Sequence, residues 1–265
     1  MEDIKHKKEF DLELAVKLAG LSQAAYFTPK SFVHKIRALG LGQYNYQLIE
    51  NNGTQCYVVY SITEKKIFIA WRGTEVSDMQ DILADLKFRK VVGHQATVHR
   101  GFKEYVDNVY LKLRNYLKDI IRRNSDSWFD IYVTGHSLGG AGALVSTNRL
   151  EDEEGFVVRC CYTFGGPRVG GWSFKDFVKT PVWRVQNNND VVTKVPLAIM
   201  GFRHIGSLCY LSQRKKIFIG GKNAWGLFVD WFRGQFSRIG DGLRDHSISE
   251  YYNTLKEILD KKNKI

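Results

Sequence analysis

Two kinds of hydrophobic pattern alternate along the chain. Apolar residues recur every three or four positions in 11–26, 102–123, 141–150 and 248–259, which predicts helices that each turn one face toward a core. Short runs rich in β-branched and aromatic residues predict buried strands; they are 56–60, 67–71, 129–134, 156–164 and 182–186. Strands that alternate with long helices are typical of an α/β protein with a mostly parallel sheet covered on both faces.

Length and composition fit one globular domain. A chain of 265 residues is near the upper end of one α/β domain, and 44% hydrophobic residues suffice for a large core. We therefore expect a single domain over residues 1–265. No apolar run approaches the length that crosses a bilayer, and the first 20 residues lack the apolar core of a secretory signal. We expect a cytoplasmic protein, or one peripheral to an intracellular membrane, with export by another route still open.

The charge balance narrows the classes of partner. Lys and Arg number 39 against 28 Asp and Glu, a net charge of +11 that suits an anionic membrane surface, acidic ligands or nucleic acid. No zinc finger, basic zipper or aromatic RNA-binding signature accompanies it, so we expect no nucleic acid. Four cysteines have no metal-ligand spacing, and we expect no metal and no cofactor. Cys160 and Cys161 adjoin in one predicted strand, so they should face opposite sides as small buried residues.

A serine lies at the junction of a predicted strand and a predicted helix. Residues 135–139 read Gly-His-Ser-Leu-Gly and match G-x-S-x-G, with strand 129–134 before the match and helix 141–150 after it. A nucleophile elbow requires this order, and it places Ser137 at a helix N-terminus that favours a developing oxyanion. A structural turn with a capping serine is the alternative. The agreement of strand, turn and helix favours a nucleophile, and we interpret His136 as structural.

A serine nucleophile needs a histidine base that a carboxylate orients. In α/β-hydrolases the chain order is serine, acid, histidine, and only His204 and His246 follow Ser137. His246 lies in a loop before the last helix, whereas His204 lies in an apparent strand, where a packed or surface histidine is expected. Asp190 follows strand 182–186, at the sheet edge where catalytic side chains gather. The alternative for Asp190 is an Asx-turn.

Ordered segments along most of the chain resemble the class 3 (fungal-type) lipases, a branch of the α/β-hydrolases. These segments are Ile69–Glu75, Val98–Phe102, Val133–Ala141, Tyr162–Gly170 and the Asp-His pair at 245–246. The chain departs from the family at Gly166 and Gly171, where asparagine is usual, and has a shortened region before Asp245.

This resemblance implies an α/β-hydrolase fold and the hydrolysis of lipid esters, above all acylglycerols. It implies a triad of Ser137, Asp190 and His246 that acts through an acyl-enzyme. It also implies an oxyanion hole formed by Thr74, through its N–H and hydroxyl, and by the N–H of Leu138. A phospholipase A1-type hydrolase and a catalytically silent lipid-surface binding module remain as alternatives.

Two further segments bear on contact with lipid. Residues 75–89 contain an amphipathic helical pattern, which by resemblance is a lid over an acyl pocket and otherwise a packed surface helix. Residues 212–244 form an insertion rich in aromatic and basic side chains before the histidine loop. Rings flanked by cations suit a membrane–water interface and predict peripheral contact with lipid. The alternative is an aromatic helix packed beside that loop.

Overall fold

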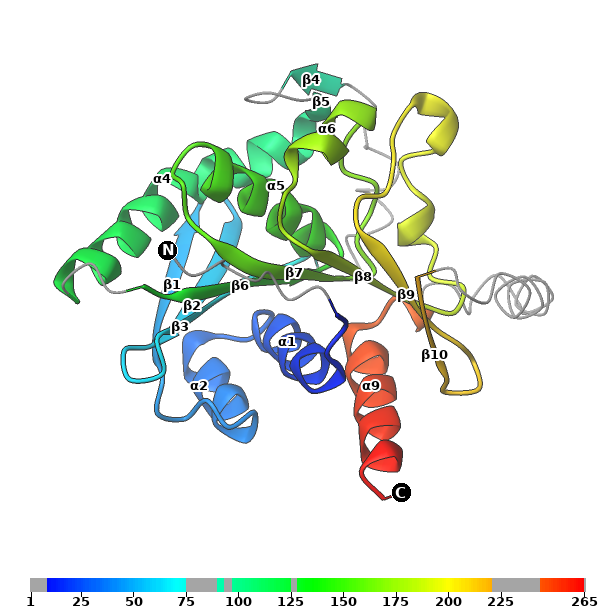
Figure 1. Ribbon diagram of the computed structural model, residues 1–265, viewed down its shortest axis with the longest axis horizontal. Coiled ribbons are helices and arrows are strands. Elements are labelled where there is room, and N and C mark those ends of the chain that lie inside the picture. Colours follow the sequence, from blue (N-terminus) through cyan, green and yellow to red (C-terminus); the bar gives the residue numbers. More distant parts are fainter. Residues whose placement is uncertain (1–8, 75–89, 93–96, 125–127, 221–243, 265) are drawn as a thin grey trace.

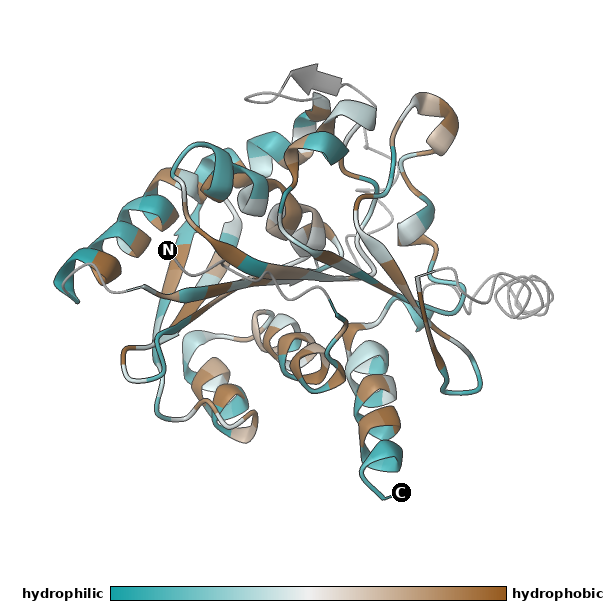
Figure 2. Cartoon of the chain, viewed as in Figure 1, coloured by the Kyte–Doolittle hydropathy of each residue, from teal (hydrophilic) through white to brown (hydrophobic). Residues whose placement is uncertain are grey.

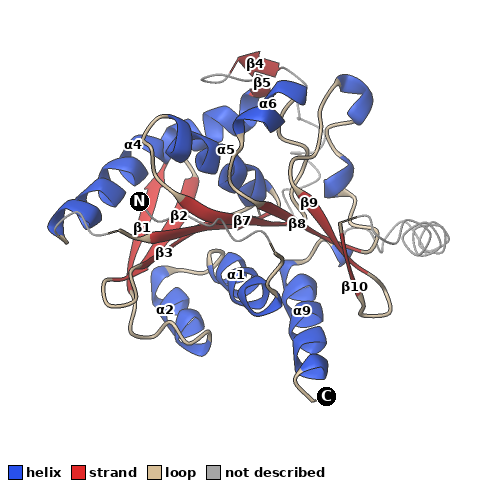
Figure 3. Cartoon of the chain, viewed as in Figure 1, coloured by secondary structure: helices blue, strands red, loops and turns tan. Residues whose placement is uncertain are grey.

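A mixed sheet of eight strands forms the centre of the molecule (Figure 1, Figure 3). The computed structural model describes residues 9–74, 90–92, 97–124, 128–220 and 244–264. In spatial order the strands are β1 (Asn45–Asn51), β2 (Thr54–Ser61), β3 (Lys66–Trp71), β6 (Asp130–His136), β7 (Val158–Phe164), β8 (Val182–Asn187), β9 (Ser207–Leu211) and β10 (Ile217–Ile219). Neighbours from β3 to β9 are parallel, whereas the pairs β1–β2, β2–β3 and β9–β10 are antiparallel. A separate small sheet pairs β4 (Lys90–Val92) with β5 (Thr97–His99).

Helices cover both faces of the central sheet (Figure 1). One face carries α4 (Arg100–Arg123), α5 (Leu138–Asp152) and α6 (Trp172–Phe177), and the other carries α1 (Leu12–Ala24), α2 (Pro29–Ala38) and α9 (Ile248–Lys262). Each face has its own cluster of buried apolar side chains, and Figure 2 shows apolar residues along the central strands and on α1. The expected α/β architecture, with a mostly parallel sheet between two helical layers, is confirmed.

The alternation of side chains in β7 agrees with the expectation from sequence. Cys160 packs in the cluster beneath α1 and α9, whereas Cys161 packs in the cluster beneath α4 and α5. All four cysteines are buried, and none of them forms a disulfide. They therefore contribute as small apolar side chains of the core.

Some elements carry too weak a pattern to be predicted. Strand β1 is mostly exposed and polar, β10 has three residues, and neither these nor α2 and β9 were expected. The predicted lid at 75–89 lies outside the described residues. Of the aromatic and basic segment, 212–220 form the turn and second strand of the β9–β10 hairpin, and 221–243 lie outside the described residues. Among the helices described, none is both long and apolar enough to cross a bilayer.

The predicted strand around His204 is wrong. Residues 202–206 form a loop before β9 with one isolated bridge, between Arg203 and Gly170. Phe202 and Ile205 are both buried, so the apolar run there reflects loop packing rather than sheet pairing. The imidazole Nε2 of His204 donates to the Thr193 carbonyl at 2.8 Å, which confirms a packed histidine. Burial and then the nearby guanidinium groups of two arginines lower the pKa of His204 to about 3.

This depressed pKa predicts a pH-dependent stability. Between the unfolded pKa of about 6.5 and the folded value, the unfolded chain binds one more proton at His204, so stability falls as the pH is lowered through this window. The free energy of unfolding is measured in urea at pH 6 and pH 4.5. It should fall less steeply with decreasing pH in His204→Gln than in native protein, by up to about 1.4 kcal/mol per pH unit. His34→Gln, on the exposed side of α2, serves as the control. Parallel profiles for native protein and His204→Gln would contradict this account.

Candidate active site

Ser137 lies in a strained turn between β6 and α5. Its backbone angles, φ 58° and ψ −127°, are rare for a residue with a side chain. A Cβ on Gly135 would collide with the carbonyl oxygen of Gly139, and a Cβ on Gly139 with that of Trp71 in β3. The two glycines of the motif therefore permit backbone contacts that no other residue allows. The predicted strand, elbow and helix are confirmed as local structure, and Ser137 is fully buried.

The two residues predicted as the oxyanion hole lie near the elbow. Leu138 is the first residue of α5, where the N–H has no partner within the helix. The end of β3 lies against the elbow, because Trp71 pairs with Gly135 and its carbonyl borders Gly139. Thr74 follows three residues later and is partly exposed. The sheet thus brings the β3 end that leads to Thr74 against the turn that holds Leu138.

His246 and Asp190 form a buried hydrogen-bonded pair. The imidazole Nδ1 of His246 lies 2.9 Å and 2.8 Å from the two carboxylate oxygens of Asp190, and neither side chain has exposed surface. A carboxylate accepts, so Nδ1 carries the proton and Nε2 of His246 presents its lone pair. Nε2 is buried and has no hydrogen-bond partner in the described part of the chain. It can therefore act as a base.

Two other donors complete the environment of the Asp190 carboxylate. The Tyr251 hydroxyl, from α9, donates to Oδ2 at 2.5 Å, and the Val192 N–H donates to Oδ1 at 2.9 Å. Burial and then the Asp190 charge raise the pKa of Tyr251 well above its usual value, so Tyr251 stays a neutral donor. The Val192 contact is the turn-closing bond of an Asx-turn. The two interpretations of Asp190 from the sequence therefore hold together.

The strand end after β7 places this pair beside the serine. The Ser137 N–H donates to the Phe164 carbonyl at 3.0 Å. A Cβ on the next residue, Gly165, would lie 2.5 Å from an Asp190 oxygen and 2.9 Å from the His246 Nδ1. Residues 164–165 thus touch the elbow on one side and the Asp–His pair on the other. The fold brings together the three residues predicted as a triad.

His136 links the elbow to the histidine loop. Its Nε2 donates to the carbonyl oxygen of His246 at 2.6 Å, and its Nδ1 accepts from the Tyr26 hydroxyl at 2.8 Å, because a carbonyl can only accept. The centroids of the two imidazole rings lie 4.5 Å apart. Burial and then the neighbouring His246 lower the pKa of His136 well below its usual value. A neutral His136 next to Ser137 therefore holds the backbone of His246, in line with its structural interpretation.

An asparagine-rich loop clamps the other side of the histidine loop. The Asn187 side chain donates to the Asp245 carbonyl at 3.0 Å, and the Asn188 side chain donates to the Asp245 carboxylate at 2.9 Å. The Asn189 N–H reaches the same carboxylate at 3.2 Å. Asp245 thus serves to hold the loop. These contacts align the segment after β8, which carries Asp190, with the segment that carries His246.

Sequence reasoning missed Tyr251, Tyr26 and the asparagine clamp. Tyr251 lies on the apolar face of an amphipathic helix, where an aromatic residue is expected in the core. One signal pointed to it: a buried tyrosine hydroxyl requires a hydrogen-bond partner. Its partner, Asp190, lies 61 residues away in the sequence, so only the folded structure shows that the two side chains meet. Within the described residues, no cluster of side chains could hold a metal ion.

The sequence of this chain is similar to those of known proteins. The family profile described as Lipase (class 3) matches residues 68–200, half of the 265-residue chain. A lipase of Rhizomucor miehei is 35% identical over 169 residues, which cover 60% of this chain and 46% of that protein. Phospholipase A1-Igamma1 of Arabidopsis thaliana is 27% identical over 218 residues, which cover 64% of this chain and 42% of that protein. The chain spans less than half the length of these relatives.

Solved structures agree on the fold. The triacylglyceride lipase of Rhizomucor miehei superposes with a TM-score of 0.69 at 26% identity, covering 78% of this chain and 83% of that one. A triacylglycerol lipase, described as having a serine protease triad at its catalytic centre, superposes with a TM-score of 0.66 at 27% identity, with the same coverage of 78% and 83%. The fold is that of the α/β-hydrolases, and the chain belongs to the class 3 lipase family.

Proposed function

We propose that this protein is a serine hydrolase that cleaves carboxylic esters of lipids, with acylglycerols as its main substrates. The observation that carries the proposal is the buried Asp190–His246 pair beside the strained elbow of Ser137. A hydrogen-bonded acid and base next to a serine at a helix N-terminus is the arrangement that acyl transfer requires. The lipases among the relatives support a lipid ester as the substrate.

In the proposed reaction the Ser137 hydroxyl attacks the acyl carbonyl while Nε2 of His246 takes its proton. Asp190 keeps Nδ1 protonated and stabilises the imidazolium that forms. The N–H groups of Leu138 and Thr74, with the Thr74 hydroxyl, hold the negative oxygen of the tetrahedral intermediate. His246 then protonates the leaving alcohol. Water, activated by the same base, releases the fatty acid and regenerates the serine.

A phospholipase A1-type activity is the second candidate. The similarity to a phospholipase A1 of Arabidopsis thaliana, 27% identical over 218 residues, favours it. The net charge of +11 also favours association with anionic lipid surfaces. The two candidates use one chemical mechanism. They differ in whether the ester is held at an oil surface or in a phospholipid bilayer.

Fatty-acid release tests the proposed function directly. Native protein should release oleate from triolein emulsion, and comparison with dioleoyl phosphatidylcholine and phosphatidylglycerol vesicles separates the two candidates. Ser137→Ala should lower the rate about 10⁴-fold or more, because the base has no nucleophile to activate.

The control is Ser173→Ala, which changes an exposed serine of α6 and should keep the native rate. Equal release by native protein and Ser137→Ala would contradict the assignment of Ser137 as the nucleophile. No release from any of the three lipids, with Ser137 still labelled by a fluorophosphonate, would point to a different ester. Neither release nor labelling would leave the lipid-surface binding module as the better account.

Substitution of Tyr251 tests how its hydrogen bond to the Asp190 carboxylate affects the reaction. Tyr251→Phe removes a donor from the Asp190 carboxylate, which concentrates negative charge opposite His246 and favours the protonated imidazolium. We expect the acidic limb of the pH profile of kcat/KM to move upward by about half a unit to one unit. The rate at pH 8 should fall less than the rate at pH 6.

Tyr252→Phe is the matched control, since Tyr252 is the next residue of α9 and has no hydrogen bond to the described part of the site. A merely structural role for the Tyr251 hydroxyl would lower the rate equally at every pH and leave the profile in place.

A further inference from the structure

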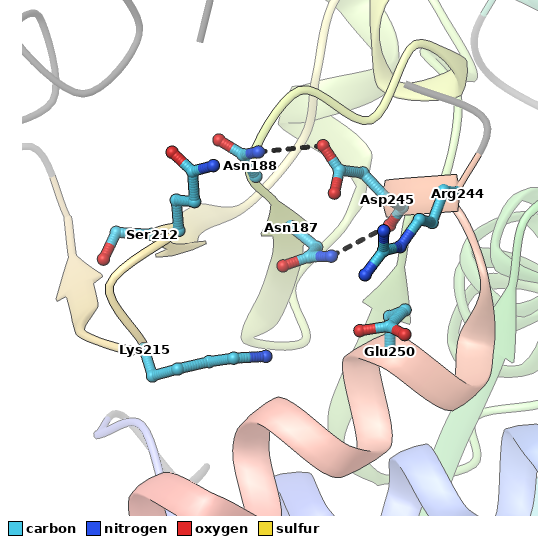
Figure 4. A pocket seen from close by; sticks show the side chains of 8 residues that line it. Asn187, Asn188, Ser212, Lys215, Arg244, Asp245 and Glu250 are labelled. Carbon is cyan, nitrogen blue, oxygen red and sulfur yellow. Dashed lines mark hydrogen bonds between the residues drawn. The ribbon is translucent and has the colours of Figure 1, made fainter. Parts of the chain in front are cut away.

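A polar pocket of about 280 Å³ lies beside the loop that carries His246 (Figure 4). Its walls come from the end of β8, the β9–β10 turn, the loop before His246 and the first turn of α9. The lining residues are Asn187, Asn188, Ser212, Gln213, Lys215, Arg244, Asp245 and Glu250. None of them belongs to the proposed triad or oxyanion hole, although Asn187, Asn188 and Asp245 make the contacts that hold the loop of His246.

Two cations in this pocket form no ion pair with a described carboxylate, although the Glu257 carboxylate of α9 attracts Lys215 electrostatically. Lys215 extends from the hairpin toward α9 and donates to the neutral Thr254 hydroxyl at 2.6 Å (Figure 4). The Arg244 guanidinium makes no hydrogen bond or ion pair with any described residue. Elsewhere on the described surface, cations such as Lys103 and Arg149 do have carboxylate partners. Two positive charges with unused donors therefore share one cavity.

The pocket also holds two carboxylates, Asp245 and Glu250, and neither forms an ion pair with these cations. The Asp245 carboxylate already accepts from the Asn188 side chain and the Asn189 N–H. Glu250 lies next to Arg244 in Figure 4, but among the described residues it forms no salt bridge with Arg244 or Lys215. Arg244 alone has five N–H donors, and Lys215 and Gln213 add others. The unused donors thus outnumber the unused charged acceptors, which favours a ligand rich in oxygen acceptors.

We propose that this pocket binds a phosphoryl group, with Arg244 and Lys215 as its main ligands. A planar guanidinium pairs with two phosphate oxygens at once, and an ammonium adds a compact positive charge. The group can come from a soluble phosphate or from the phosphomonoester headgroup of a lipid. A bound phosphoryl group bridges the β9–β10 hairpin to residues 244–245, and so steadies the loop that precedes His246.

Isothermal titration of the full chain with inorganic phosphate tests the proposal without reference to catalysis. Arg244→Gln and Lys215→Gln should each raise Kd about tenfold, the effect of losing one charge-assisted bond. Glu250→Gln should lower Kd, because it removes a negative charge from the pocket. Arg214→Gln and Lys216→Gln change neighbouring cations of the same turn that do not line the pocket, and should leave Kd unchanged.

A second arm identifies the source of the phosphoryl group. Ser137→Ala protein, in which hydrolysis is blocked, is mixed with phosphatidylcholine vesicles with or without phosphatidic acid. Binding to phosphatidic acid that Arg244→Gln weakens and Arg214→Gln does not indicates a lipid headgroup. Phosphate binding without such vesicle dependence indicates a soluble ligand. Failure of both probes to bind, or equal losses for the pocket and control variants, would overturn the proposal, whatever the protein hydrolyses.

Discussion

A charged carboxylate without exposed surface must be compensated by hydrogen bonds, and Asp190 has no exposed surface. Its compensation comes from the imidazole of His246, the hydroxyl of Tyr251 and the N–H of Val192. These donors belong to the histidine loop, to α9 and to the turn after β8. The hydrogen bonds that compensate this one buried charge therefore hold three segments together, and the position of His246 follows from them.

The elbow provides the second half of the site. Three backbone segments, from β3, β6 and α5, approach so closely that only glycine fits at positions 135 and 139. The strain at Ser137 is sustained by the sheet and helix on either side of it. His136 then joins the two halves, because it lies next to Ser137 in the chain and donates to the His246 carbonyl. Ser137 and His246 are positioned by one connected set of contacts.

The parts predicted from sequence are those that local pattern determines. The elbow, the strands around it and the amphipathic α4 follow from periodicity and turn chemistry, and the order of serine, acid and histidine singled out Asp190 and His246. The parts missed depend on distant contacts. Tyr251 has the pattern of a core residue, and the asparagines at 187–189 have the pattern of a simple turn. The loop at 202–206 has the apolar pattern of a strand, because buried apolar residues occur in both.

The central claim is that the buried Asp190–His246 pair activates Ser137, and the most direct test is the rate of covalent labelling by a fluorophosphonate. Intact-protein mass spectrometry should show one adduct on the native chain, mapped to Ser137, and none on Ser137→Ala. Asp190→Asn should label slower by about 10³–10⁴-fold, because the histidine loses its orienting charge. An adduct on another residue, or equal labelling rates for native protein and Asp190→Asn, would contradict this account.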